Sequence, residues 1–244
     1  MSNIIKTLTT TTLILLSFSV LTNCEGTQSK KKNTTSKVDS TSTPQIKPKV
    51  KATNTTPKRK FPRLTDDNVM EFFLEYEKEN KENKVRITTD FGEIDILLFD
   101  ETKFHRANFI FLTKQHYFDD TQFYRVVNNF IIQGGSSDDY NISKKRSNIG
   151  KYLLPPDTKK GFKHDRGIVS MPSSEIENAY KLASPYEFFI VQKQGGAHHL
   201  DGAYTAFGKV IKGMDVVDTI AAQKTDKAEW PLHNIYIRKV EIID

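Results

Sequence analysis

The sequence predicts a mainly β fold, either a closed barrel or a sandwich with helical plugs. Short stretches with the residue pattern of strands recur about eight times between Val85 and the C-terminus. Only two segments among them have the spacing of amphipathic helices, and the sequence has no internal repeat. Many short strands with few helices are typical of barrels and sandwiches.

The N-terminus has the pattern of an export signal, and residues 1–23 are interpreted as a lipoprotein signal peptide. Lys6 precedes an apolar stretch from Leu13 to Leu21, far shorter than the ~20 residues that span a bilayer. Cys24, the only cysteine, follows directly and resembles the acylated cysteine of a bacterial lipobox, although Asn23 is an unusual residue before it. The alternative is an ordinary secretory signal with an incidental cysteine. We favour lipidation of Cys24, which would tether the chain to a membrane without crossing it.

Residues 24–63 are expected to form a disordered basic tether. The segment is mostly Lys, Thr, Ser, Asn and Pro, with too few apolar side chains to offset its ordering entropy. Residues 25–63 contain eleven Lys and Arg against two acidic residues, whereas residues 64–244 contain 24 basic and 28 acidic residues. The net charge of +6 therefore resides in the tether, and the mildly acidic remainder argues against nucleic-acid binding.

Residues 64–84 are predicted to hold an accessory helix. Thr65 is a plausible N-cap, followed by two aspartates that favour a helix start. Val69, Phe72, Phe73 and Tyr76 then recur at helical spacing and give one apolar face. We expect this face to pack on the main domain.

The main domain is predicted over residues 85–244, beginning with a hairpin around Asp90-Phe91-Gly92. Ile94, Ile96 and Leu98 alternate to one face of its second strand. Strands are predicted at residues 85–88, 93–99, 122–127, 130–133, 167–171, 187–192, 206–211 and 235–243. Helices are predicted at residues 102–116 and 214–222.

The sequence lacks the motifs of several common chemistries. No Gly-Lys-Ser/Thr phosphate loop follows a strand, and no serine lies in a nucleophile elbow. None of the six histidines forms a helical His-x-x-x-His pair, and the adjacent His198 and His199 are expected to point apart. We therefore expect neither a metal nor another cofactor.

Five motifs, in order along the chain, carry the functional signal. They are Phe123-Tyr124-Arg125-Val126-Val127, Phe130-Ile131-Ile132-Gln133-Gly134-Gly135, Gly167-Ile168-Val169-Ser170-Met171, Glu187-Phe188-Phe189-Ile190 and the segment from Leu200-Asp201-Gly202 to Phe207-Gly208-Lys209-Val210. At these residues the chain resembles the cyclophilins, from about Val85 to Asp244 in unbroken order. A single such motif is weak evidence, but so many in register make the resemblance specific.

The resemblance implies an eight-stranded antiparallel barrel closed by two helices, with a substrate groove on its outer wall. It also implies peptidyl-prolyl cis/trans isomerase activity, in which Arg125 is catalytic and Gln133 hydrogen-bonds the substrate backbone. The other residues implied to contact substrate are Tyr124, Phe130, Ile131, Met171, Pro172, Ser173, Glu187, Phe189, His199, Leu200 and Tyr204.

Four positions depart from the family pattern. Tyr124 replaces a histidine beside the arginine, and its hydroxyl retains a hydrogen-bonding tip. Glu187 replaces a glutamine that steadies the arginine, and a bidentate pair between Glu187 and Arg125 is expected, which would offset part of the arginine's charge. Pro172-Ser173-Ser174 replaces Ala-Asn-Ala in a stretch that acts largely through its backbone.

The fourth departure predicts weak inhibition by cyclosporin. His199 replaces a tryptophan that this cyclic peptide contacts in the family. Because the smaller ring offers less apolar surface, we expect weak inhibition in a titration of isomerase activity. Nanomolar inhibition would contradict this prediction.

Two functions remain open at this point. The first is a monomeric isomerase that assists the folding of exported proteins, held in the bacterial cell envelope by Cys24. The second is a catalytically weak module that binds proline-containing peptides as a chaperone or scaffold, favoured by Tyr124 and Glu187. In both, proline-containing polypeptides are the partners.

Overall fold

The structure, a computed structural model, describes residues 59–173 and 179–244. The predicted signal peptide, the predicted lipidation site Cys24 and most of the predicted tether lie outside the described residues. None of the helices in the described part of the chain has the length and apolar character that a bilayer crossing requires.

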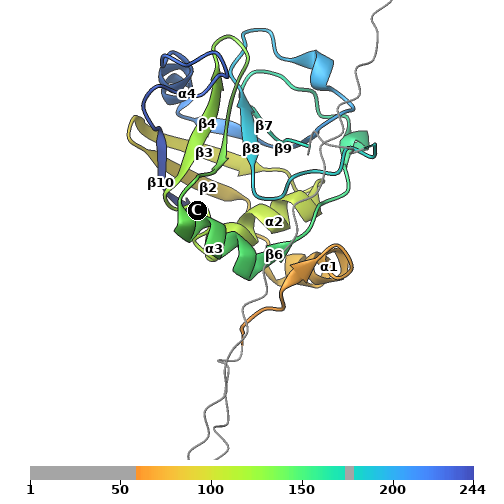
Figure 1. Cartoon of the computed structure of the whole chain (residues 1–244). Coiled ribbons are helices and arrows are strands. Elements are labelled where there is room, and N and C mark those ends of the chain that lie inside the picture. Colours follow the sequence, from red (N-terminus) through yellow and green to blue (C-terminus); the bar gives the residue numbers. More distant parts are fainter. Residues whose placement is uncertain (1–58, 174–178) are drawn as a thin grey trace, which may run out of the picture. The chain divides into compact units, whose positions relative to one another are not determined.

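Eight strands form a closed barrel in the order β10-β2-β3-β9-β7-β8-β5-β4 (Figure 1). Every pairing in it is antiparallel, and β10 pairs with both β2 and β4 to close the ring. The strands are β2 (Lys84–Thr89), β3 (Gly92–Leu98), β4 (Thr121–Val127), β5 (Ile131–Ser136), β7 (Ile168–Met171), β8 (Phe188–Val191), β9 (Thr205–Lys212) and β10 (Tyr236–Ile242). The predicted fold class is confirmed.

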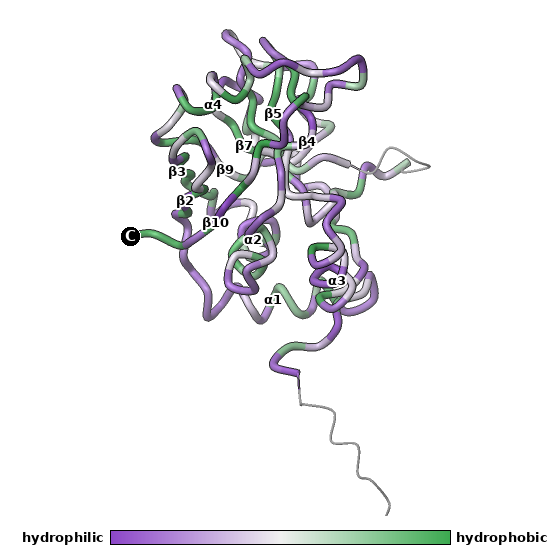
Figure 2. Tube along the Cα trace, turned by 60° about the vertical axis from the view of Figure 1, so that its left-hand side comes forward, coloured by the Kyte–Doolittle hydropathy of each residue, from purple (hydrophilic) through white to green (hydrophobic). Residues whose placement is uncertain are grey.

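The barrel interior is an apolar core rather than a channel. Ile94, Ile96 and Leu98 point into it, as their alternation predicts, and each is at most 1% exposed. Phe109 of α2 (Lys103–Lys114) and Phe188 of β8 pack together in this core, with ring centroids 5.6 Å apart. In Figure 2 hydrophobic residues run along the strands β3, β5 and β7, whereas the surrounding turns are mostly hydrophilic.

Four α-helices accompany the barrel in the described residues, two more than the predicted pair of caps. They are α1 (Val69–Glu79), α2 (Lys103–Lys114), α3 (Tyr140–Ile149) and α4 (Met214–Ala221). Figures 1 and 2 show α4 at one end of the barrel and the other three at the opposite end. The two predicted caps are α2 and α4, and α1 is the predicted accessory helix.

Helix α2 is buried along nearly its whole length because α1 covers the side that faces away from the barrel. All nine residues from His105 to Thr113 are buried. Phe72 and Tyr76 of α1 place their rings 5.1 and 5.3 Å from that of Phe111. Arg106, whose side chain is 3% exposed, donates to Glu77 of α1 at 3.1 Å. The accessory helix α1 is therefore packed firmly on α2, as predicted.

The start of α1 differs from the prediction. Asn68, not Thr65, is the N-cap residue, and its side chain accepts a hydrogen bond from the Thr65 amide at 2.9 Å. Leu64–Thr65 is a short strand, β1, which pairs in parallel with β6 (Gly150–Lys151). Phe61, assigned to the tether, packs against Phe111 with ring centroids 5.3 Å apart. Local propensity favoured an earlier helix start and a longer tether, but tertiary contacts fix this segment.

Helix α3 was not predicted because its sequence has almost no apolar face. Ile142 is its only buried residue, and Tyr140 is 76% exposed. The Asp139 side chain caps it by accepting from the Asn141 amide at 2.6 Å. Gly150 ends it at a positive φ of 147°, where a Cβ atom would lie 2.0 Å from the Leu64 carbonyl oxygen. Only glycine permits this approach of β6 to β1.

Candidate active site

A bulge in β4 places two successive side chains on the outer wall of the barrel. Phe123 pairs with Gly134 and Arg125 pairs with Gln133, so Tyr124 is an extra residue in β4. Strand side chains normally alternate between faces, but at a bulge two neighbours can oppose one partner residue. Tyr124 and Arg125 are both partly exposed, whereas Phe123 is buried.

The strand register continues this row of side chains. Gln133 of β5 pairs with Phe189 of β8, so Arg125, Gln133 and Phe189 lie on three adjacent strands. Phe188, the preceding residue of β8, points into the barrel core instead. The alternation along one strand therefore gives Phe188 to the interior and Phe189 to the outer wall.

An apolar pocket lies at this row, outside the barrel. Phe189 and Ile131 are each 3% exposed and belong to a hydrophobic cluster separate from the interior core. Phe130, Leu200 and Tyr204 pack against the same cluster. All five line one groove of about 1120 Å³, together with Tyr124, Arg125, Gln133, Pro172, Ser173 and Glu187. The structure thus brings together eleven of the thirteen residues predicted to contact substrate.

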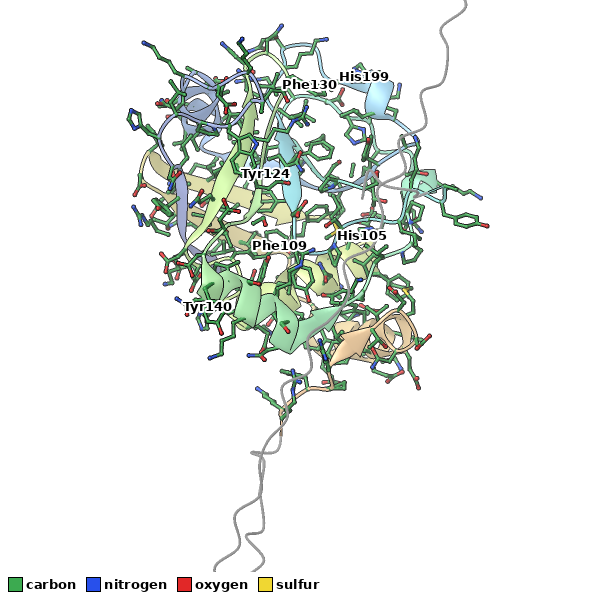
Figure 3. The ribbon with its side chains drawn as sticks, in the orientation of Figure 1. His105, Phe109, Tyr124, Phe130, Tyr140 and His199 are labelled. Carbon is green, nitrogen blue, oxygen red and sulfur yellow. The ribbon has the colours of Figure 1, made fainter. Side chains whose placement is uncertain are left out.

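The other two, His199 and Met171, do not line the groove. His199 lies in a short 3-10 helix, η2 (His198–Leu200), and its ring stacks on that of Phe130 with centroids 5.4 Å apart (Figure 3). It therefore supports one wall of the pocket. Met171 is 1% exposed and belongs to the interior core of the barrel, so its prediction as a contact residue is not supported.

The expected ion pair between Arg125 and Glu187 is not formed. Arg125 pairs with Glu229 instead. The Nε of Arg125 donates to the Glu229 carboxylate at 2.6 Å, and the side chains of Arg125 and Glu229 are 36% and 42% exposed. Glu229 lies in the loop between α4 and β10, in the left-handed region at φ 67°. Its carbonyl accepts from the Val126 amide at 2.9 Å, which fixes the loop to β4.

Glu187 instead takes part in a second hydrogen-bonded group. The Tyr124 hydroxyl donates to Glu187 at 3.0 Å and accepts from the Gln133 side-chain amide. Burial, and next the negative charge of Glu187, raise the pKa of Tyr124 well above its usual value, so the phenol stays protonated. Trp230 packs against Tyr124, and the centroids of their rings are 5.9 Å apart. Glu229 and Trp230 are site residues that the sequence did not indicate.

A network of hydrogen bonds around the buried His164 supports the pocket residue Phe189. The Nδ1 of His164 lies 2.8 Å from Asp201, and its Nε2 lies 2.9 Å from the Ser170 hydroxyl. The His164 ring also stacks on Phe189 with centroids 6.0 Å apart. This order of side chains is that of a hydrolase triad, but Ser170 is 0% exposed and offers no nucleophile to a substrate. The network holds Phe189 and the η2 loop in place, and burial lowers the pKa of His164.

The described residues contain no cluster of three or more His, Cys, Asp or Glu side chains placed to bind a metal ion. The outer wall offers a partly exposed guanidinium, that of Arg125, beside an apolar pocket. A closed barrel with a mostly apolar groove and a few polar groups on its outer wall defines a class of ligand-binding barrels. Comparison with known proteins identifies the family within that class.

The family model of the cyclophilin type peptidyl-prolyl cis-trans isomerases matches residues 84–242, so the chain belongs to this family. It is 36% identical over 169 residues to peptidyl-prolyl cis-trans isomerase-like 2 of Rhizopus delemar, covering 68% of this chain but only 30% of that protein. It is 32% identical over 164 residues to a peptidyl-prolyl cis-trans isomerase of Acinetobacter baylyi, covering 65% of this chain and 82% of that protein.

Solved structures agree with these relatives. A cyclophilin type peptidyl-prolyl cis-trans isomerase of Cryptosporidium parvum superimposes with a TM-score of 0.56 at 28% identity, covering 67% of this chain and 98% of that one. The same protein in the presence of the dipeptide Ala-Pro gives a TM-score of 0.54, covering 66% and 99%.

Proposed function

We propose that the chain catalyses cis/trans rotation of X-Pro bonds in exported polypeptides, with Arg125 as its catalytic residue. The observation that carries the proposal is the row of Arg125, Gln133 and Phe189 across three adjacent strands, at the mouth of an apolar pocket. The remaining walls of this pocket are apolar and would suit the ring of a proline. They are formed by Phe130, Ile131, Leu200 and Tyr204. The carboxamide of Gln133 is placed to hold the substrate backbone nearby.

The chemistry requires no nucleophile and no proton transfer. Rotation about a peptide bond breaks its resonance, with a barrier of about 18–20 kcal/mol. In the twisted state the amide nitrogen regains a lone pair, which a guanidinium N–H can bind but which the planar ground state does not offer. The apolar pocket immobilises the ring and keeps out water that would favour the planar amide.

NMR exchange spectroscopy on a short Ala-Pro peptide tests the proposal. Uncatalysed exchange takes tens to hundreds of seconds, so catalysis is readily detected. We expect cis/trans exchange to accelerate in proportion to the protein concentration. An exchange rate equal to that in buffer alone would contradict the proposed isomerase activity. Peptide binding without faster exchange would support the alternative, a catalytically weak binding module.

One contact favours that alternative, and it leads to a prediction for Glu229. The carboxylate offsets part of the Arg125 charge, but it also fixes Nε and leaves the terminal amino groups without a partner among the described residues. We expect positioning to dominate, so that Glu229→Ala lowers kcat/KM about fivefold, roughly the 1 kcal/mol of a well-placed exposed ion pair. Glu229→Gln retains a hydrogen-bond acceptor and should restore most of the rate.

Glu241→Ala serves as the control for this pair, because Glu241 forms an exposed ion pair with Lys239 and does not line the groove. Both rates are measured in the same peptide exchange assay. A Glu229→Ala protein that is faster than the wild type would show that the carboxylate competes with the substrate for Arg125.

We further propose that Cys24 is acylated and that the protein acts as a monomer in the bacterial cell envelope. The support is the short apolar stretch before the only cysteine and the polar, basic composition of the residues after it. Labelling with palmitate and membrane fractionation test this directly. Cys24→Ser should abolish both the label and the membrane association, and label retained in that variant would contradict the proposal.

A further inference from the structure

The groove does not end at the apolar pocket. Beyond Glu187 it continues into a polar extension whose side chains come from α3, from β6 and from the segment before α1. The extension is lined by Arg63, Asp66, Ser143, Arg146, Ser147 and Lys151. Arg63 and Asp66 precede residues 84–242, so this wall includes a part of the chain outside the matched family domain.

Residues 63–66, which precede the matched family domain, are held against it by specific contacts. Leu64, between the two charged residues, is 0% exposed and pairs with Gly150 in the β1–β6 sheet. The Asp66 carboxylate accepts a hydrogen bond from the Leu153 amide at 2.8 Å. Because β1 and Asp66 are both bonded to the β6 region, the position of Arg63 relative to the groove is restricted.

Arg146 of α3, another residue of the extension, is also held by specific contacts. Tyr186 is 1% exposed and donates to the Gly150 carbonyl at 2.8 Å. The Arg146 guanidinium lies 4.7 Å from the centre of the Tyr186 ring, a cation–π contact that orients it. Its Nη1 lies 3.9 Å from Glu187, within ion-pair range but beyond hydrogen-bond length, and within residues 59–173 and 179–244 its side chain donates no hydrogen bond, so it can bind another acceptor.

The charges in the extension do not cancel. Arg63, Arg146 and Lys151 are cationic, against the carboxylates of Asp66 and Glu187. Both carboxylates already accept hydrogen bonds, Asp66 from the Leu153 amide and Glu187 from the Tyr124 hydroxyl. In the described part of the chain, neither Arg63 nor Lys151 forms a side-chain ion pair. The extension therefore has unused donors for an anion.

We infer that this extension binds the carboxylate of an acidic residue in the substrate, so that the isomerase favours proline-containing segments with Asp or Glu near the proline. The inference rests on the proposed function, because the chain must first occupy the proline pocket. The extension and the pocket belong to one groove, so a single extended polypeptide can contact both.

Matched peptides test the inference. Each carries an Ala-Pro core with Glu, Gln or Lys placed two or three residues from the proline on either side, and kcat/KM is measured by NMR exchange. At one position at least we expect the Glu peptide to exceed the Gln peptide about threefold, the effect of one or two partly exposed ion pairs, with the Lys peptide slowest. In about 1 M salt, where the Debye length is about 3 Å, the difference should largely vanish.

Variants assign the preference to the extension. Arg146→Gln and Arg63→Gln should each reduce the Glu-to-Gln ratio of kcat/KM, and the double variant should bring it close to one. Arg238→Gln is the matched control, because Arg238 is an exposed arginine paired with Asp90 that does not line the groove. Thermal unfolding confirms that each variant is folded.

The two levels of the proposal fail differently. Equal rates for the Glu, Gln and Lys peptides, or a preference for Lys, would overturn the acidic selectivity and leave the isomerase intact. No acceleration with any peptide would overturn the proposed function itself. A Glu preference that survives in the double variant would place the anion site elsewhere.

Discussion

Replacing Arg125 by alanine is expected to lower kcat for X-Pro exchange by about 10²-fold, the usual effect of removing one preorganised donor to a transition state. The donor acts on the amide nitrogen only when the bond is twisted, so the loss falls on kcat. The apolar pocket remains in this variant, and KM should change little. NMR exchange measured over a range of peptide concentrations separates the two constants.

Two controls accompany this variant. Arg125→Lys retains the charge but not the planar fork of donors, and we expect it to recover only a small part of the rate. Because the Arg125 side chain is 36% exposed and its partner Glu229 is 42% exposed, the stability of the fold should change by less than about 1 kcal/mol. Wild-type exchange by a folded Arg125→Ala protein would remove Arg125 from the mechanism.

Much of the site was predictable because its residues lie in strand motifs. Arg125, Gln133 and Phe189 each lie in one of the motifs by which the chain resembles the cyclophilins, and antiparallel pairing of the three strands places them side by side. The resemblance implied Met171 as a contact residue, but its side chain lies in the barrel core and does not line the groove. All four residues of β7 are buried.

The partner of Arg125 was not predictable for a different reason. Glu229 is 104 residues away along the chain, in a loop with no strand or helix pattern. Its position depends on a left-handed backbone conformation and on one hydrogen bond to β4. The groove extension depends likewise on the β1–β6 pairing of two-residue strands, which are too short to leave a periodic signal.

The interior of the barrel yields the largest predicted effect on stability. Phe188 is 0% exposed, and its ring lies edge-on to three others, 5.6 Å from Phe109, 5.8 Å from Phe118 and 5.9 Å from Phe123. Phe188→Ala should lower the free energy of unfolding by about 3–5 kcal/mol, since α2, β4 and β8 cannot collapse into the cavity without breaking the barrel pairing. Urea denaturation followed by circular dichroism measures the change.

Phe189→Ala is the matched variant, because the same side chain is removed one residue further along β8. The Phe189 ring lines the groove, so its removal widens an existing groove and leaves no closed cavity in the core, and the loss of stability should be clearly smaller than for Phe188→Ala. Its effect should appear instead in kcat/KM, because the pocket loses a wall. The two neighbours thus separate folding from function: equal destabilisation with equal activity loss would mean that the core and the groove wall are a single packing unit, contrary to the two separate clusters that the structure shows.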